Sequence, residues 1–416
     1  MNVVSRCAAA LAATVVIGTA TPAVAAPPSP SPKMAIPDGM YGTADPTYDG
    51  VWRQSLALLA QNEVGVDPAD KAVAWLAGQQ CANGAFPAFR ADTGKPCATK
   101  LAVDTNSTAA AVQALSTLTT TYDSQVDKAV AWLKSVQNKD GGWGYSPGGA
   151  SDANSTSLVI GALTQAGVTV PNLRKDGKSP VDALAKLALP CGGKDGGAFA
   201  YQPDKKGVLT ANADATAAAV LGAYADTLAG SPQDDADAPR SCVKATDDSL
   251  ETQVGDNGAV WLARTLAKDG YLKSVLPGAK DQPDYGNTAD AVVALASVGR
   301  SDQAAASLHW LEGHAGKWAE QGGPAAYAQL ILAASVVQGG DAHHFGGMDL
   351  VTLLNATGPA PKAINKLPAK AAPSHSPKAS DDNDGSLPVA WTVGGGLALG
   401  ALIGFALMLR GRKRQS

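Results

Sequence analysis

The sequence contains few charged residues and few aromatic residues, and its basic residues do not outnumber its acidic residues. Asp, Glu, Lys and Arg make up 17% of the 416 residues, and Phe, Trp and Tyr make up only 5%. The formal net charge of −4 gives no basic surface of the kind that nucleic acids bind. We therefore expect no nucleic-acid partner.

Motifs for a metal site and for a sheet are also lacking. The five histidines are not grouped with the cysteines and no C-x-x-C spacing occurs, which disfavours structural zinc. No sustained strand pattern occurs, which favours an all-α protein.

Removal of a signal peptide would leave four cysteines, an even number that is typical of disulfides in an oxidising compartment. Three pairings are open, and we favour Cys81 with Cys97 and Cys191 with Cys242, because each pair brackets one Gly/Pro-rich connection.

The two ends of the chain indicate export and membrane anchoring. Residues 1–26 contain an early basic residue, an apolar stretch and a small-x-small cleavage sequence, as secretory signal peptides do. Residues 387–409 form an uncharged run long enough to cross a bilayer, and the basic tail 410–416 follows. Basic residues stay on the cytoplasmic side, so we expect an extracellular body, one transmembrane helix and a cytoplasmic C-terminus at the cell membrane. The alternative for the apolar run is a buried core helix.

Composition divides the rest of the chain into three segments. Residues 27–44 are a leader that begins with a Pro-rich stretch. Residues 357–386 are rich in Pro, Ala, Lys and Ser and nearly empty of large apolar residues, which predicts a disordered stalk. Residues 45–356 remain as the folded body.

The body consists of two kinds of repeated helical segment. Segments of the first kind begin with small polar residues and continue as alanine-rich helices, as in DTNSTAAAVQAL from Asp104. Segments of the second kind carry a sequence such as AVAWL and then a glycine-aromatic turn, as in DKAVAWLKSVQNKDGGWG from Asp127. Six segments of each kind alternate along the chain. We therefore expect a closed ring in which six small, alanine-rich helices line the inside and six helices of the second kind, four of them with a tryptophan, wrap the outside.

Two of the turns carry the residues of a known motif, which are Gln80, Gly84 and Phe86 in the first turn and Gln137, Gly141 and Trp143 in the second. They resemble the QW repeats of the terpenoid cyclase and protein prenyltransferase superfamily, and the resemblance covers roughly residues 45–355. It implies an all-α toroid, an α6/α6 barrel. In that family the QW residues tie outer helices to their neighbours and do no chemistry, so we expect a structural role for them here.

The reacting groups of the related proteins are missing from this sequence. Squalene-type cyclases use a D-x-D-D acid on an inner helix, and protein prenyltransferases bind zinc through Asp, Cys and His, but no inner helix here offers either set. Complement-like toroids carry a C-G-E-Q thioester, whereas Cys191 is followed by Gly-Gly-Lys. Trp52 is the only one of the eight tryptophans on an expected inner helix, a thin aromatic lining for guiding a carbocation. We therefore expect no catalytic residue, no metal and no cofactor.

The starts of the expected inner helices carry more polar residues than capping requires. One Asp, Asn, Ser or Thr caps a helix, but three or four recur at each start. Parallel inner helices would bring these clusters to one mouth of the barrel, which predicts a polar rim around a small-ligand seat. Capping remains the alternative for each single residue. The candidate ligand-binding residues are Trp52, Asp104, Asn106, Asp152, Asn154, Asn212, Asp214, Asp284 and Asn287.

Two functions of different classes follow from this sequence. The first is a surface-anchored protein that binds a small ligand without catalysis and passes it to a transporter or lid-protein partner, or that serves as a surface scaffold. The toroid domains of intrinsic factor and transcobalamin, which bind cobalamin, have a similar D-T-x-A-type pattern at their helix starts, although a stalk is expected here where their β-rich lid domain begins. The second is an enzyme, either a diverged prenyltransferase-like or terpene-cyclase-like enzyme or a carbohydrate-active toroid. It would use a pair of rim carboxylates, drawn from Asp104, Asp152, Asp214 and Asp284, as acid and base. We favour the first.

Overall fold

The computed structural model describes residues 35–364 except 119, 235–240, 247–249, 276–278 and 280. The chain divides into two units, and every described helix and strand belongs to the unit that begins at Ile36. The expected signal peptide, transmembrane run and basic tail, and most of the expected stalk, lie outside the described residues. Within those residues, none of the helices combines the length and the apolar character needed to span a bilayer.

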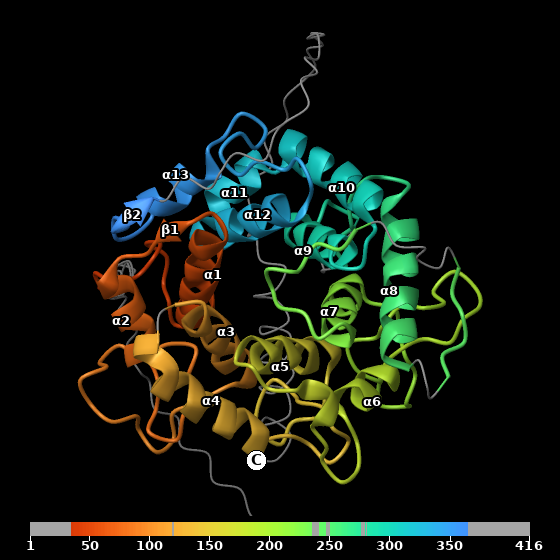
Figure 1. The fold of residues 1–416 in the computed structure, drawn as a ribbon, viewed down its shortest axis with the longest axis horizontal. Helices are drawn as coiled ribbons and strands as arrows, with labels where there is room; N and C mark the ends of the chain where they lie inside the picture. Colours follow the sequence, from red (N-terminus) through yellow and green to blue (C-terminus); the bar gives the residue numbers. More distant parts are fainter. Residues whose placement is uncertain are drawn as a thin grey trace, which may run out of the picture. The chain divides into compact units, whose positions relative to one another are not determined.

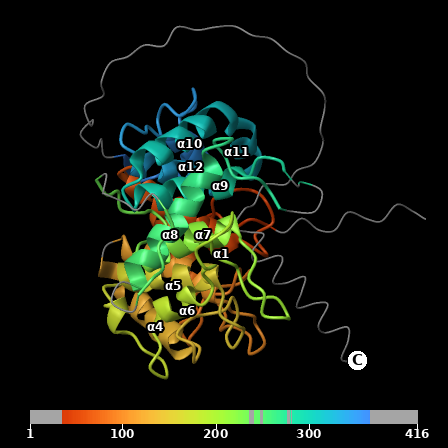
Figure 2. The same cartoon turned by 90° about the vertical axis from the view of Figure 1, so that its right-hand side faces the viewer.

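The helices of the body alternate between an inner and an outer ring (Figure 1), which Figure 2 shows from its edge. Each inner helix contacts its two inner neighbours, and the contact between the last and the first closes the ring. The expected α6/α6 toroid is thereby confirmed. The inner helices are α1 (Gly50–Glu63), α3 (Thr105–Ser116), α5 (Ala153–Gln165), α7 (Ala213–Ala223), α9 (Tyr285–Ala296) and α12 (Pro324–Val336). The outer helices are α2 (Asp70–Gly78), α4 (Asp123–Ser135), α6 (Pro180–Ala185), α8 (Leu250–Leu266), α10 (Ser301–His314) and α13 (Leu350–Ala356).

Short elements join the rings. Helix α11 (Gly316–Gly322) connects α10 to α12, and two 3-10 turns cover Thr120–Tyr122 and Val170–Asn172. Strands β1 (Val66–Asp67) and β2 (Ala363–Ile364) pair antiparallel. These are the only two strands among the described residues, so the body is essentially all-α.

The difference between the two kinds of helix follows from how much of each is buried. Eleven of the 13 residues of α5 are buried, whereas α4 buries only four of its 13 residues along one stripe. A helix that packs on all sides within a narrow ring has room mainly for small side chains, while an outer helix needs one apolar face. The alanine-rich and tryptophan-bearing patterns of the sequence therefore separate the inner from the outer ring.

The glycine-aromatic turns join outer helices to inner helices. Nε2 of Gln137 donates to the Gly141 carbonyl and Nε1 of Trp143 donates to the Leu133 carbonyl, each at 2.8 Å. Gly141 has a φ of +94°, and a Cβ at this position would overlap the carbonyl oxygen of Ser179 at the start of α6. The turn of the first repeat is built alike, with Nε2 of Gln80 donating to the carbonyl of Gly84 at 3.0 Å. Nε2 of Gln80 also donates to the Gln125 carbonyl of α4 at 2.7 Å, so this residue joins the end of α2 to the next outer helix.

A hydrogen bond from a backbone N–H to a threonine hydroxyl links each of four turns to the inner helix that follows it. In four successive repeats the N–H of the residue that ends the turn donates to a fully buried threonine Oγ1 at 2.9–3.0 Å. One residue of each polar cluster thus serves the fold. The pairs are Phe86 with Thr108, Trp143 with Thr156, Phe199 with Thr216, and Leu272 with Thr288.

Two disulfides close loops on the outside of the ring. Cys81 pairs with Cys97 after α2, and Cys191 pairs with Cys242 between α6 and α8. The favoured pairing of the four cysteines is confirmed.

The body extends beyond the boundaries expected at 45 and 356. Tyr41 of the expected leader is fully buried, and its hydroxyl donates to Oε1 of Gln61 at 3.0 Å. Residues 357–364 of the expected stalk also lie against the body, where β2 pairs with β1 and Nζ of Lys362 lies 2.9 Å from Oδ1 of Asp70. Composition did not predict that these two segments are ordered. The buried side chain of Tyr41 in the first segment and the backbone hydrogen bonds of β2 in the second are enough to fix an otherwise polar stretch.

Candidate functional site

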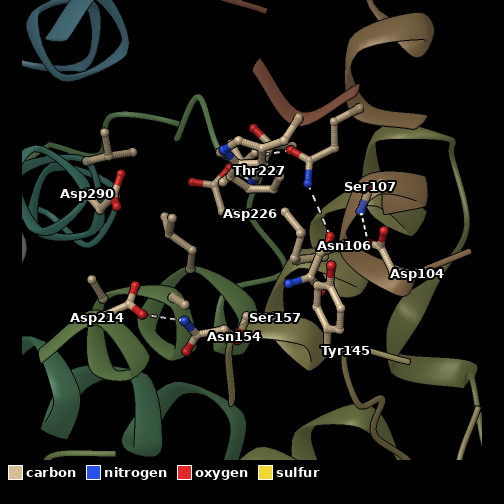
Figure 3. Close-up of a pocket in the computed structure, with 18 of the residues that line it drawn as sticks. Asp104, Asn106, Ser107, Tyr145, Asn154, Ser157, Asp214, Asp226, Thr227 and Asp290 are labelled. Atoms are coloured by element: carbon tan, nitrogen blue, oxygen red, sulfur yellow. Dashed lines mark hydrogen bonds between the residues drawn. The ribbon is translucent and has the colours of Figure 1, made fainter. Parts of the chain in front are cut away.

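A cup opens within the inner ring on the side where the inner helices begin. It encloses about 890 Å³, counting the open space at its mouth, and is lined by residues of α1, α3, α5, α7 and α9, by Tyr145 and by residues 226–228. Figure 3 draws 18 of its lining residues and labels ten of them, which come from both sides of the ring. We call this space the cup.

The loop that follows α7 forms the floor of the cup. The N–H of Leu228 donates to Oε1 of Gln113 at 2.9 Å, and Nε2 of Gln113 donates to the Leu158 carbonyl at 3.1 Å. The carboxylate of Asp226 accepts hydrogen bonds from both the N–H and the hydroxyl of Ser231. The floor is therefore held by side chains of α3 and by its own turn.

Four of the candidate residues are N-caps of inner helices. The side chains of Asp104, Asp152, Asn212 and Asp284 each accept from the backbone N–H three residues later, at 2.6–3.2 Å. This is the capping arrangement that stabilises a helix start. Asp152, Asn212 and Asp284 do not line the cup, nor does Asn287, whose amide donates to Asp284 at 2.8 Å. Capping describes the geometry of Asp152, Asn212 and Asp284, and Asn287 binds the cap of α9.

The other candidates face the cup as a group. Trp52, Asn106, Asn154 and Asp214 line it, and Asp104 lines it while also capping α3. The structure thus brings together five of the nine residues named from the sequence, contributed by four different inner helices.

Several residues outside the nine candidates also line the cup, and a simple projection of the inner helices predicts them. Counting from each cap, positions two, five, six and nine turn inward, as expected for one face of a helix. Asp290 is the most informative of them, because it is an acidic residue within an otherwise apolar stretch. Tyr145 comes from a turn, and its place depends on the ring as a whole. The residues on this face are Asn106 and Gln113 in α3; Asn154, Ser157 and Leu158 in α5; Asp214, Ala217, Ala218 and Leu221 in α7; and Asp290 and Val293 in α9.

The carboxyl groups of the cup are held away from bulk water. This raises the pKa of Asp214 to about 7, although Nδ2 of Asn154 donates to its Oδ2 at 2.5 Å and opposes the rise. The same cause, reinforced by the charge of Asp214, raises the pKa of Asp290 well above its usual range, while Nε2 of Gln329 donates to it at 3.2 Å. The pKa of Asp104 is raised to about 6 by burial. Near neutral pH the cup therefore holds carboxyl groups that are partly protonated.

Three polar atoms of the cup lack a partner. Oδ1 of Asn106, Oδ1 of Asn154 and Oγ of Ser157 are shielded from solvent and have no hydrogen-bond partner among the described residues. Asn154 and Ser157 are only 6% and 4% exposed. All three atoms accept hydrogen bonds, so they match a ligand that donates them.

The described residues contain no group of three or more His, Cys, Asp or Glu that could hold a metal ion. The side chains that line the cup offer carboxyl, amide and hydroxyl groups beside apolar and aromatic surface.

Comparison with known proteins identifies the fold. Residues 43–202 match the prenyltransferase alpha-alpha toroid domain. The match covers less than half of the chain, and the toroid fold of the body agrees with it. The drimenyl diphosphate synthase of Streptantibioticus cattleyicolor is 38% identical to this toroid protein over 80 residues, which are 19% of this chain and only 13% of the synthase.

Solved structures give more distant similarities. A protein from Actinoplanes shares 16% identity at a TM-score of 0.43, over 68% of this chain and 76% of its own. The ent-copalyl diphosphate synthase of Streptomyces platensis shares 17% identity at a TM-score of 0.43, over 69% of this chain and half of its own. A sugar epimerase from a ruminal bacterium shares 16% identity at a TM-score of 0.40, over 66% of this chain and 80% of its own. These similarities are too distant to support an inference about activity.

Proposed function

We propose that this toroid protein binds a small organic ligand in the cup without converting it. The observation that carries the proposal is the set of shielded acceptor atoms on Asn106, Asn154 and Ser157. An unpaired buried polar group costs about 1–3 kcal/mol. A ligand that donates hydrogen bonds to these atoms would recover that free energy, and this gain would favour binding in the cup.

The absence of conversion is inferred from the sequence. The chain has no D-x-D-D acid on an inner helix and no cysteine there for a prenyltransferase zinc site. The one tryptophan of the cup, Trp52, gives little aromatic surface for stabilising a carbocation.

We further propose that the protein works at the cell surface. Support comes from the signal-peptide pattern of residues 1–26 and from the apolar run 387–409 with the basic residues that follow it. A receptor placed there would hand its ligand to a transporter or to a lid protein. Cobalamin is the first ligand to test, because intrinsic factor and transcobalamin, whose toroid domains the sequence resembles, bind it.

Native mass spectrometry of the full-length protein, released from detergent micelles, tests ligand binding directly. We expect a bound species at one-to-one stoichiometry, and we expect Ser157→Ala to weaken it. The matched control is Ser116→Ala, because the Ser116 hydroxyl also lacks a partner but lies outside the cup. Equal effects of the two substitutions, or none, would contradict binding in the cup.

A second candidate is acid catalysis, which is favoured by one specific observation. Asp214 and Asp290 both face the cup and both have a raised pKa, as a general acid at neutral pH requires. The measurement is incubation with prenyl diphosphates and with oligosaccharides, followed by mass analysis of the small molecules. Conversion that Asp290→Asn abolishes, with substrate still bound, would replace the binding proposal by an enzyme.

A further inference from the structure

The charged groups of the cup are unbalanced. Five carboxyl groups line it, and no Lys, Arg or His does among the described residues. Three of the five are engaged elsewhere, because Asp49 lies 3.5 Å from the Arg53 guanidinium, Asp104 caps α3 and Asp226 holds the floor. Asp214 and Asp290 remain, and Figure 3 shows them on the same side of the cup.

The partners of these two carboxyl groups are neutral. Asp214 accepts from the amide of Asn154, and Asp290 accepts from the amide of Gln329. No ion pair to either group occurs within the described parts of the chain. The two carboxyls therefore lack the opposite charge that usually accompanies acidic groups removed from water.

We propose that the cup selects a ligand with an ammonium group, which lies beside Asp214 and Asp290 and donates to the free acceptor Asn154 Oδ1. This inference rests on the proposed ligand-binding function and narrows it to one chemical class. An ammonium group offers three N–H donors and a positive charge. On this side the cup offers hydrogen-bond acceptors and acidic groups, which match these donors and this charge.

The surroundings indicate the rest of the ligand. Beyond the carboxyls, the wall continues with Ala217, Leu221 and Val293, which are apolar. Trp52 and Tyr145 line the cup elsewhere with aromatic surface. An alkyl chain attached to the ammonium group would meet these side chains, whereas an anionic group would meet carboxylates.

Binding of an ammonium group would be coupled to protons. The raised pKa of Asp214 means that this carboxyl is partly protonated in the free protein near pH 7, and a bound cation favours its charged form. Ligand affinity should therefore rise from pH 5.5 to pH 8, with release of protons. The other titratable groups near this pair are Asp152, Asp284 and Tyr201, and all of them are acidic.

The test compares putrescine, 1,4-butanediol and succinate, which share a four-carbon skeleton and differ in charge. Isothermal titration calorimetry of the full-length protein in detergent, in two buffers of different ionisation enthalpy, measures both affinity and proton release. We expect putrescine to bind at least about tenfold more tightly than the diol, with succinate weakest, and to release protons on binding. We expect Asp214→Asn and Asp290→Asn each to lower putrescine affinity at least about tenfold.

The matched control is Asp349→Asn, because Asp349 caps the outer helix α13 and lies outside the cup. Asparagine also caps helices well, so this variant should fold and bind putrescine normally. Equal affinity for putrescine and the diol, or putrescine affinity that does not change with pH, would overturn the ammonium inference. Cobalamin binding that is sensitive to Ser157→Ala but insensitive to Asp290→Asn would do the same while leaving the proposed function intact. Failure of every compound, cobalamin included, would count against both.

Discussion

The hydrogen bond between Trp143 and Thr156 offers a sharp test of how the ring is held together. The Trp143 N–H donates to Thr156 Oγ1 at 3.0 Å, and the threonine side chain is fully buried. Thr156→Val keeps the shape of the side chain but removes the acceptor. It leaves a buried N–H unpaired, which costs about 1–3 kcal/mol of unfolding free energy.

The same helix contains its own control. Thr164 also lies on α5, but its hydroxyl has no hydrogen-bond partner among the described residues. Thr164→Val removes a hydroxyl of the same kind without breaking a hydrogen bond, so we expect a change within about 0.5 kcal/mol.

Thermal unfolding of the full-length protein, followed by tryptophan fluorescence at one fixed scan rate, compares the two variants. For a body of this size, each kcal/mol of lost unfolding free energy lowers Tm by about 2 °C. We therefore expect Thr156→Val to lower Tm by about 2–6 °C and Thr164→Val to lower it by about 1 °C or less. A Tm for Thr156→Val that matches that of Thr164→Val would refute the assignment of this threonine to the fold.

Three further predictions concern the cup, a disulfide and the body boundary. Because the folded-state pKa of Asp214 lies near 7, above the ordinary 3.8, the folded protein binds more protons than the unfolded chain between these values. The contribution of Asp214 to stability falls as pH rises, so Asp214→Asn should shift Tm upward relative to the wild type more at pH 8 than at pH 5; an equal shift at both would contradict the raised pKa. The Cys191–Cys242 disulfide spans 51 residues, so replacing both cysteines by serine should cost about 4 kcal/mol and lower Tm; an unchanged Tm would exclude that contribution. Tyr41→Phe should cost about 1 kcal/mol through the lost hydrogen bond to Gln61, whereas a true leader residue would give no change in Tm.

The ring was predictable because its two helix types face different packing constraints. Inner helices are buried on nearly all sides and outer helices on one stripe, and both conditions leave periodic signals along the chain. The disulfide pairing was also predicted correctly, although the Cys191–Cys242 pair brackets a segment that contains the whole of α7. The body boundaries were less predictable, since Tyr41 and β2 are held by contacts with residues distant in sequence.

The candidate site was predicted only in part, because capping and ligand binding use the same residue types. Asp152 and Asn154 illustrate this, since both are polar, both are buried and they lie two positions apart. The first accepts from the Ser155 N–H and caps α5, whereas the second faces the cup. Composition cannot separate the two roles, but the direction of the side chain relative to the helix axis can.

The repeat itself separates structural residues from those that could recognise a ligand. The cap is Asp or Asn and the tethering residue is Thr at the starts of α3, α5, α7 and α9, because every copy must begin a helix and bind the preceding turn. The residue two positions after the cap neither caps the helix nor binds the turn, and its type differs between the four copies. It is Asn106, Asn154, Asp214 and then Gly286. The position six residues after the cap is Ala110, Leu158, Ala218 and then Asp290. The inner helices thus agree where the fold requires agreement and differ on the face that lines the cup, and these differences place the acidic pair on α7 and α9 alone. A ligand that binds this toroid should therefore contact the α7 and α9 side of the cup through polar groups and the remaining wall through weaker contacts.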